Sequence, residues 1–237
     1  MEKLNKSQIK VLLSVLKKKN YTIYTKPYQL NIVGRRTNST KPNSFDDWIY
    51  IFYKDEDGNW EGYKAPITTD AGTYWLKNPS LSKGTALLKA GQYKDTYKID
   101  KHRSSYYALT QRLKPVVVIR DYNRDSILDF NNGREDKGMF GINIHKASTI
   151  GTQKYVDKSS AGCQVFENTE DFEDFMDMAY KHKDLYGNVF TYTLIDERAY
   201  NRSRLKRRLV IGTSISVLLI GLGIGSFYLY KKYIKNK

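Results

Sequence analysis

The chain has only one cysteine in 237 residues and lacks an apolar run at its N-terminus. The single Cys163 excludes an intrachain disulfide and a zinc site built from several thiolates. Because the chain begins M-E-K-L-N-K-S-Q, we expect no cleaved secretion leader. Apolar residues nevertheless make up 40% of the chain and aromatic residues 14%, which is enough for a packed core over most of its length.

The positive charge of the chain is unevenly distributed. The formal net charge is +15, yet residues 1–197 hold 30 Lys and Arg against 25 Asp and Glu. Six more cations lie within residues 198–208, and four lie in the last seven residues. These two basic clusters flank one segment, a pattern that fits lipid headgroups better than a nucleic-acid groove. We therefore expect a lipid bilayer as a partner, and no nucleic acid.

The flanked segment, residues 209–230, reads L-V-I-G-T-S-I-S-V-L-L-I-G-L-G-I-G-S-F-Y-L-Y, 22 residues without a charge. A helix of this length crosses a hydrocarbon core of about 30 Å. The sequence thus predicts a single-pass membrane protein anchored near its C-terminus, with a basic connector over 197–208 and a basic tail over 231–237. Gly221 and Gly225 have the G-x-x-x-G spacing that lets two such helices pair, so a homo-oligomer stays open. The basic clusters do not decide which side of the membrane the rest of the chain faces.

The region before this segment is expected to be mainly β with peripheral helices (α+β), of sandwich or barrel type. Residues 5–19 place apolar side chains at helical spacing, which predicts an amphipathic helix. A second helix is predicted over Thr169–His182, with Thr169 as N-cap and acidic residues in the first turn. Short segments rich in β-branched and aromatic residues predict strands at 21–33, 48–53, 60–63, 72–76, 85–88, 106–111, 116–120, 139–145 and 189–195.

Cys163 and His145 are the candidate catalytic pair. His145 ends an apolar strand-like segment, and Cys163 follows 18 positions later in S-A-G-C. A nearby imidazole can take the proton of a thiol and make it a nucleophile, and backbone N–H groups around the cysteine can form an oxyanion hole. His102 is a candidate second imidazole, although a lone histidine is more often a surface or core residue. Supporting roles are expected for Gly162, Ser160 and Lys146.

This stretch resembles the L,D-transpeptidase (YkuD-type) family. The family motif places a histidine ahead of Ser/Thr-His-Gly-Cys, and here 14 residues separate His145 from Ser160. The segment T-T-D-A-G-T-Y-W-L, residues 68–76, is similar to a strand of that family. The resemblance implies that Cys163 attacks a peptide carbonyl and that His145 is its base. Ala161 replaces the second histidine of the motif, and Gln164-Val165-Phe166 replaces the usual hydrophobic-Asn-Arg.

The departures from the motif leave a different substrate, a hydrolytic outcome or an inactive relative open. S-A-G-C-Q, the D-x-N-x-D turn and Y-Q-L-N-I-V-G-R-R are together similar to a family of phage-encoded or prophage-encoded proteins. The expected organisation is an N-terminal helix and strand extension over 1–44, an L,D-transpeptidase-like domain over 45–196, and then the connector, membrane helix and tail.

Residues 121–129, D-Y-N-R-D-S-I-L-D, have the spacing of a calcium-binding loop. The candidate ligands are Asp121, Asn123, Asp125, Asp129 and the carbonyl of Ile127. Ser126 stands where such loops usually have glycine, and Asx-rich turns also occur without a metal. Calcium is the one cofactor that the sequence suggests.

These features lead to two alternative functions. The first is a membrane-anchored, cysteine-dependent transpeptidase or hydrolase acting on peptidoglycan stem peptides, in a host membrane or a virion membrane. The second is a non-enzymatic structural or binding protein of a viral membrane, whose decayed transpeptidase-like domain docks onto capsid proteins or cell wall.

Overall fold

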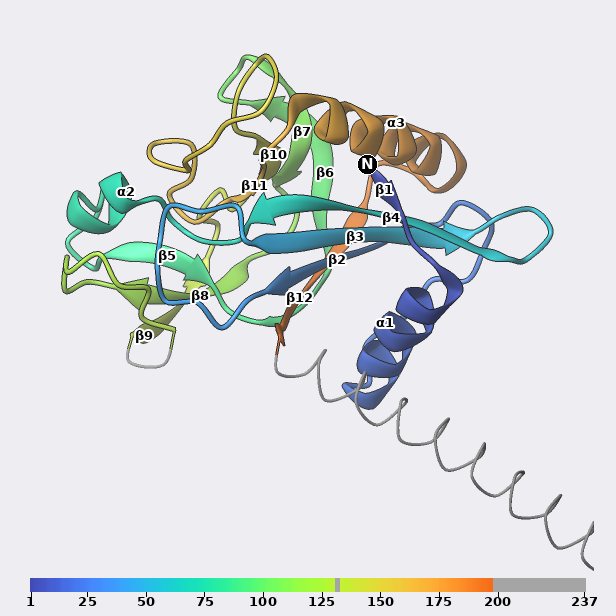
Figure 1. The fold of residues 1–237 in the computed structure, drawn as a ribbon, viewed down its shortest axis with the longest axis horizontal. Coiled ribbons are helices and arrows are strands. Elements are labelled where there is room, and N and C mark those ends of the chain that lie inside the picture. Colours follow the sequence, from blue (N-terminus) through green and yellow to red (C-terminus); the bar gives the residue numbers. More distant parts are fainter. Residues whose placement is uncertain (131–132, 198–237) are drawn as a thin grey trace, which may run out of the picture.

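The computed structural model describes residues 1–130 and 133–197. The predicted mainly β fold with peripheral helices is confirmed, with 39% strand and 19% helix. The elements, in chain order, are β1 (Glu2–Lys3), α1 (Lys6–Lys18), β2 (Asn31–Arg36), β3 (Asp47–Lys54), β4 (Trp60–Thr68), α2 (Thr73–Lys77), β5 (Thr85–Leu88), β6 (Gly91–His102), β7 (Tyr106–Gln111), β8 (Val116–Asp121), β9 (Arg134–Gly138), β10 (Ile144–Lys146), β11 (Gln164–Phe166), α3 (Thr169–Tyr186) and β12 (Phe190–Asp196) (Figure 1).

The main sheet closes on itself. Its strand order is β1-β4-β11-β10-β7-β6-β12-β2-β3, and β3 also pairs with β4. Because β3, the last strand in this order, also pairs with β4, the strands from β4 to β3 form a closed ring. Strand β1 lies outside the ring and pairs with the edge of β4 that also pairs with β11. Since β1 and β2 belong to this sheet, it continues across the expected boundary at residue 44. A second, three-stranded sheet has the order β5-β8-β9.

Side chains of neighbouring ring strands alternate between two apolar clusters, as strand geometry requires. Ile32 of β2 and Ile49 of β3 belong to the large cluster inside the ring, whereas Val33 and Tyr50 face outward into a second cluster. The apolar stripe of α1 covers this outer cluster through Ile9, Leu12, Val15 and Leu16. A capping box between the Asn5 and Gln8 side chains begins α1.

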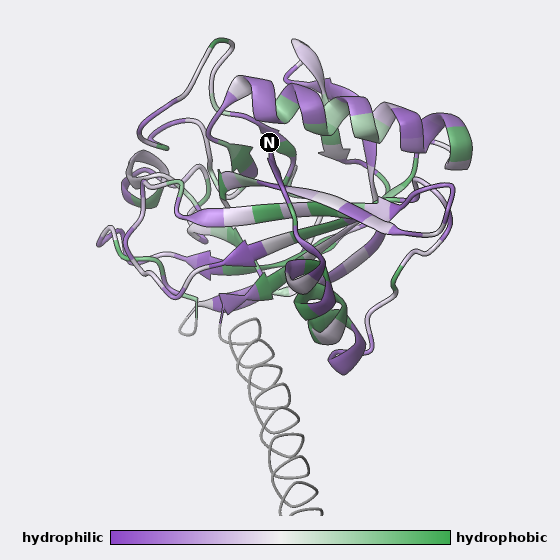
Figure 2. Ribbon diagram, turned by 45° about the vertical axis from the view of Figure 1, so that its right-hand side comes forward, coloured by the Kyte–Doolittle hydropathy of each residue, from purple (hydrophilic) through white to green (hydrophobic). Residues whose placement is uncertain are grey.

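Helix α3 lies across β10 and β11 (Figure 1). Green segments recur along it between longer purple ones, which marks an amphipathic helix (Figure 2). Its Phe172 and Phe175 pack on Phe166 of β11, with ring centroids 5.6 Å and 5.3 Å apart. The helix is capped by Asn168, whose side chain accepts the N–H groups of Glu170 and Asp171, so the predicted N-cap at Thr169 is wrong by one residue. Helix α3 thus fixes the strand that follows Cys163.

Several predicted strands are corrected by the structure. Residues 73–77 form α2 instead of a strand, because tertiary contacts outweigh the β-propensity of T-Y-W-L. Gly72 begins this helix at a point where a Cβ would lie 2.0 Å from the Asp157 carbonyl oxygen, and the Trp75 Nε1–H donates to the Lys158 carbonyl. The strand predicted at 21–33 begins only at Asn31, and that at 139–145 is reduced to β10. Sequence patterning also missed β6.

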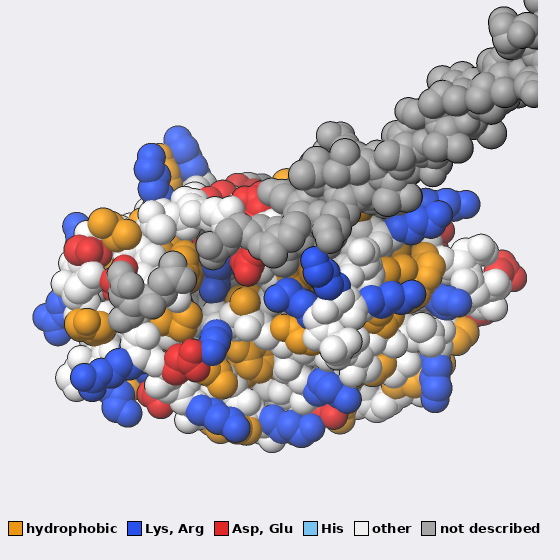
Figure 3. Space-filling model, turned by 90° about the horizontal axis from the view of Figure 1, so that it is seen from below, with side chains coloured by type: hydrophobic (Ala, Val, Ile, Leu, Met, Phe, Trp, Pro, Cys, Tyr) orange, Lys and Arg blue, Asp and Glu red, His pale blue; other side chains and the backbone are white. Residues whose placement is uncertain are grey.

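The predicted membrane helix, its basic connector from residue 198 and the basic tail lie outside the described residues. Within residues 1–130 and 133–197, none of the helices is both long and apolar enough to cross a membrane. Figure 3 shows Lys and Arg side chains spread among acidic and apolar ones over the face seen from below. This spread matches the small net charge of the first 197 residues.

Candidate active site

The pairing of β10 with β11 brings Cys163 and His145 onto neighbouring strands. The two strands are parallel, with Ile144 opposite Gln164 and His145 opposite Val165. Asn143 and Cys163 precede these partners, and the Asn143 N–H lies 3.5 Å from Cys163 Sγ. Cys163 lies directly before β11, two positions before the Val165 that pairs with His145. The long sequence separation is thus reduced to a diagonal between adjacent strands.

His145 and His102 form a stacked pair of imidazoles. Their ring centroids are 4.1 Å apart and the planes are inclined by 22°. Burial lowers the pKa of His145 to about 3 and that of His102 to about 4. His102 lowers the pKa of His145 further, and Arg103 and Arg112 lower that of His102. Both imidazoles are therefore neutral at physiological pH.

Hydrogen bonding assigns a different tautomer to each ring. The Gln111 N–H can only donate, and it lies 2.9 Å from Asn143 Oδ1, so the Asn143 Nδ2–H₂ must face His102 Nδ1 at 3.0 Å and donate to it. The Lys146 carbonyl can only accept, so His145 Nδ1 carries the proton that it receives at 2.8 Å. The Nε2 of His145 consequently holds a lone pair. It is buried and has no hydrogen-bond partner.

The Cys163 thiol is half-buried and neutral in this state. Burial raises its pKa above the usual value, against the opposing effects of the Asn143 N–H and Arg103. The thiol donates to the Gly141 carbonyl at 3.4 Å. No hydrogen bond joins Cys163 to His145. The site therefore rests as a neutral thiol near a neutral imidazole, which can work by general-base transfer but not as a preformed ion pair.

The S-A-G-C turn positions Cys163 through its small residues. Gly162 has φ +116°, and a Cβ there would lie 1.8 Å from the Ala86 carbonyl oxygen. The fully buried Ser160 hydroxyl lies 2.6 Å from the Asp70 carbonyl and 2.9 Å from the Cys163 carbonyl, and it accepts the Gly162 N–H. Ser160 therefore braces the turn. The Gly162 N–H is already used, whereas the Cys163 N–H has no hydrogen-bond acceptor in the described part of the chain and is free for an oxyanion.

Lys146 contributes its backbone carbonyl, and not its side chain, to the candidate site. Its carbonyl accepts the His145 Nδ1–H and, at 3.2 Å, the Tyr106 hydroxyl. Its ammonium instead pairs with Glu173 of α3 at 3.1 Å. Sequence reasoning missed Tyr106 and Asn143, which orient the two imidazoles. The position of Asn143 two residues before His145, hence on the same face of a strand, was the one available signal.

One cavity borders the S-A-G-C turn at Ala161, and a second lies on the far side of Arg120. The first, of about 290 Å³, is bordered by Ala161, Met139, Phe140 and Trp75. The second, of about 480 Å³, lies beyond Arg120, which lines both. The Arg120 guanidinium stacks 4.6 Å from the Phe140 ring centroid and bonds to Asp136. The two cavities thus share Arg120 as a lining residue, and neither is lined by Cys163 or His145.

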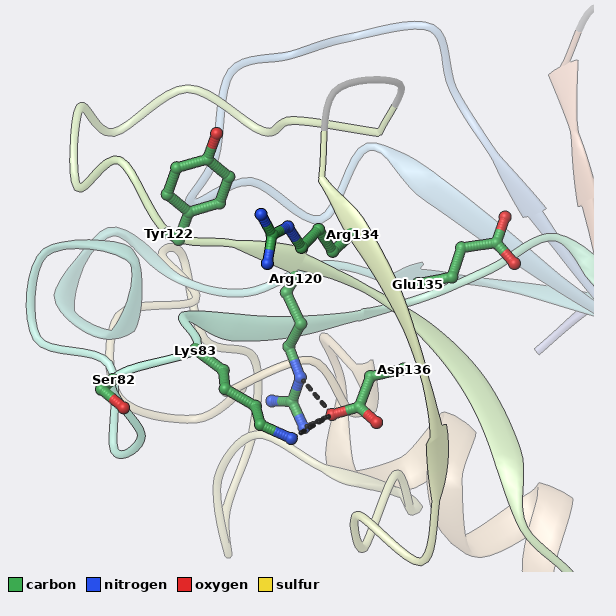
Figure 4. A pocket seen from close by; sticks show the side chains of 7 residues that line it. All are labelled: Ser82, Lys83, Arg120, Tyr122, Arg134, Glu135 and Asp136. Atoms are coloured by element: carbon green, nitrogen blue, oxygen red, sulfur yellow. Dashed lines mark hydrogen bonds and ion pairs between the residues drawn. The ribbon is translucent and has the colours of Figure 1, made fainter.

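The second cavity is positively charged. Figure 4 shows Lys83, Arg120 and Asp136 converging, with Arg134 above them and Glu135 directed away. Glu135 is paired outside the cavity with Lys89. Three cations and two carboxylates line this cavity, and one of the carboxylates, Glu135, is already paired with Lys89, so the balance favours an anionic group.

The predicted calcium ligands lie together in the loop between β8 and β9. Asn123 Nδ2 donates to Asp125 Oδ2 at 2.9 Å and to Asp129 Oδ2 at 2.8 Å. The Asp129 N–H donates to Asp121 Oδ2 at 3.1 Å. Among the residues described, no group of three or more His, Cys, Asp or Glu side chains is gathered as a metal site.

Comparison of the chain with protein-family models and with curated proteins found no match. The functional assignment therefore depends on the geometry of the site.

Proposed function

We propose that this chain is a membrane-anchored, cysteine-dependent acyltransferase or peptidase acting on peptidoglycan stem peptides, with an L,D-transpeptidase-like site. The observation that supports this most is the lone-pair Nε2 of His145 on the strand beside Cys163. The stack with His102 and the hydrogen bond to Lys146 hold that ring in one tautomer. A neutral imidazole with a fixed tautomer is suited to act as a general base.

In the proposed reaction, a side-chain rotation brings the thiol proton to His145 Nε2. The sulfur then bonds to the carbonyl carbon of the peptide, and the Cys163 N–H donates to the developing oxyanion. The C–N bond breaks, and the imidazolium returns its proton to the leaving amine. The resulting thioester is resolved by an acceptor amine in transpeptidation or by water in hydrolysis.

The two cavities are consistent with a peptide substrate that has free carboxylates. The cavity beside Ala161 suits an acyl chain, and the cavity beyond Arg120 suits a carboxylate. Stem peptides of peptidoglycan have both features. Ala161 stands where the resembled motif has a histidine, so His102 is proposed as the second imidazole of this variant.

The membrane anchor is proposed from residues 209–230. A single-pass helix there would hold the catalytic domain against a bilayer, in a host membrane or in the membrane of a virus particle. Such an anchor suits an enzyme that remodels wall next to a membrane, and G-x-x-x-G pairing could form a homo-oligomer.

The test uses the full-length protein in detergent micelles with cross-linked stem peptides. Mass spectrometry should show an acyl adduct on Cys163 and cleaved or exchanged peptide. Cys163→Ala should abolish both. His145→Gln should slow the reaction about 100-fold or more, because general-base catalysis contributes on that order. His182→Gln is the matched control, since His182 lies on α3, and its Nδ1 accepts the Leu30 N–H.

A folded wild-type protein that forms no adduct and no product would contradict the enzymatic proposal. The alternative, a non-enzymatic binding protein of a viral membrane, is favoured by the protonated thiol and by the absence of a hydrogen bond between Cys163 and His145. If that alternative holds, Cys163→Ala would not change the fraction of the protein that co-sediments with cell wall or capsids.

A further inference from the structure

Residues 121–129, at the start of the connection from β8 to β9, carry three carboxylates against one cation, Arg124. Asp121, Asp125 and Asp129 lie within nine residues. None of them takes part in an ion pair among residues 1–130 and 133–197. Burying part of such a cluster away from water destabilises the folded protein, unless a cation or a proton neutralises the charge.

Asp121 is the buried member of the cluster. Only 1% of it is exposed, and its Oδ1 is sealed from solvent with no hydrogen-bond partner. The same carboxyl group faces the loop, since its Oδ2 accepts the Asp129 N–H. A buried carboxylate oxygen without a donor is what a bound cation would satisfy.

The Asn123 amide occupies the position between the two exposed carboxylates. Its Nδ2 donates to both Asp125 and Asp129 and so supplies a positive dipole that the two carboxylates share. Turning this amide over would exchange Nδ2 for Oδ1 and leave oxygen atoms alone around the centre. That arrangement is repulsive without a cation and favourable with one.

We propose that this loop binds a calcium ion through Asp121, Asn123, Asp125, Asp129 and the Ile127 carbonyl, with the Asn123 amide turning over on binding. Calcium accepts six to eight oxygen ligands in flexible geometry, and waters complete the set. Magnesium is disfavoured because it needs near-ideal octahedral geometry at shorter distances.

The role of the ion is structural. The loop places the buried Leu128 against Ala71, Leu76 and Leu87, the cluster beneath α2, and the Leu128 N–H donates to the Thr40 carbonyl. Arg120, one residue before Asp121, lines both cavities. Bound calcium would therefore support the wall that the two cavities share, at a distance from the Cys163 chemistry.

The experiment measures the melting temperature of the full-length protein after chelation and on titration with CaCl₂ or MgCl₂. Calcium at a hundred times its Kd should raise the melting temperature by about 5 °C or more. Magnesium at the same concentration should give a smaller rise. Asp125→Asn should abolish most of the calcium response, whereas Asp57→Asn in the β3–β4 turn, the matched loss of charge, should keep it.

Asn123→Asp provides the decisive variant. It removes the amide bridge and adds a carboxylate, so after chelation the variant should have a lower melting temperature than the wild type. Calcium should then raise the melting temperature of the variant by more than it raises that of the wild type. If the amide only braces a turn, the variant will melt lower and calcium will not restore it. That result, or a wild-type melting temperature unchanged by calcium up to about 10 mM, would overturn the proposal.

Discussion

Acid should destabilise this protein through the buried imidazole of His145. Its pKa is about 3 in the folded protein and 6.5 when unperturbed. As the pH falls through about 6.5, the unfolded chain binds the proton first, so the free energy of unfolding falls and continues to fall until about pH 3. At about 1.4 kcal/mol per pKa unit, His145 alone removes about 2 kcal/mol between about pH 7.5 and about pH 5. His102 acts in the same direction.

The assay is urea unfolding of the wild type and of His145→Gln at both pH values. The variant cannot take up the imidazole proton, so its loss of stability between the two pH values should be smaller by about 2 kcal/mol. Tyr106→Phe is the control, because it removes a neighbour of the ring, while its own phenol, with a pKa of about 12, does not titrate in this range. It should shift stability equally at both pH values. An identical pH dependence in wild type and His145→Gln would refute the buried neutral imidazole and the general base built on it.

Three further predictions concern the S-A-G-C turn. Alkylation of Cys163 by iodoacetamide, followed by mass spectrometry, should accelerate steadily as the pH rises from about 7 to about 9, because burial raises the pKa of the thiol; a rate already at its plateau at neutral pH would indicate a thiolate–imidazolium pair instead. Gly162→Ala should cost about 2 kcal/mol or more in urea unfolding, since its Cβ would meet the Ala86 carbonyl at positive φ; Gly58→Ala, also at positive φ but in open space, should cost about 1 kcal/mol, and equal costs would exclude the clash. Ser160→Ala should lower the free energy of unfolding by about 1–3 kcal/mol by leaving the Asp70 carbonyl without its donor; Ser159→Ala, which changes a partly exposed hydroxyl, should cost less, and the reverse order would contradict the bracing role.

The helices that cover the sheet could be predicted because their apolar spacing and capping residues are local. Residues 5–19 and Thr169–His182 fall on α1 and α3 within a few residues. Residues 72–76 could not be predicted as helical, because the contacts that begin α2 come from Asp157 and Lys158, far along the chain. The closed ring could not be predicted from the sequence either, because it depends on which strands pair with one another.

The candidate pair could be proposed from sequence because the spacing from His145 to S-A-G-C resembles a known motif. The supporting residues could not, because the roles of Asn143 and Tyr106 depend on the pairing of β10 with β7 and β11. The same pairing decides that Lys146 contributes a carbonyl to the site and its ammonium to an ion pair with α3. Sequence patterns identify reactive groups more readily than the residues that set their tautomers.

The position of β12 has a mechanical consequence for a chain held at its C-terminal end. Strand β12 is the last of the ring and lies between β6 and β2, antiparallel to one and parallel to the other. A pull applied beyond Asp196 along the strand would load both ladders in shear, so their hydrogen bonds must break together and not one after another as at a peeling edge. The barrel would thus resist extraction by force at the end where the chain leaves it.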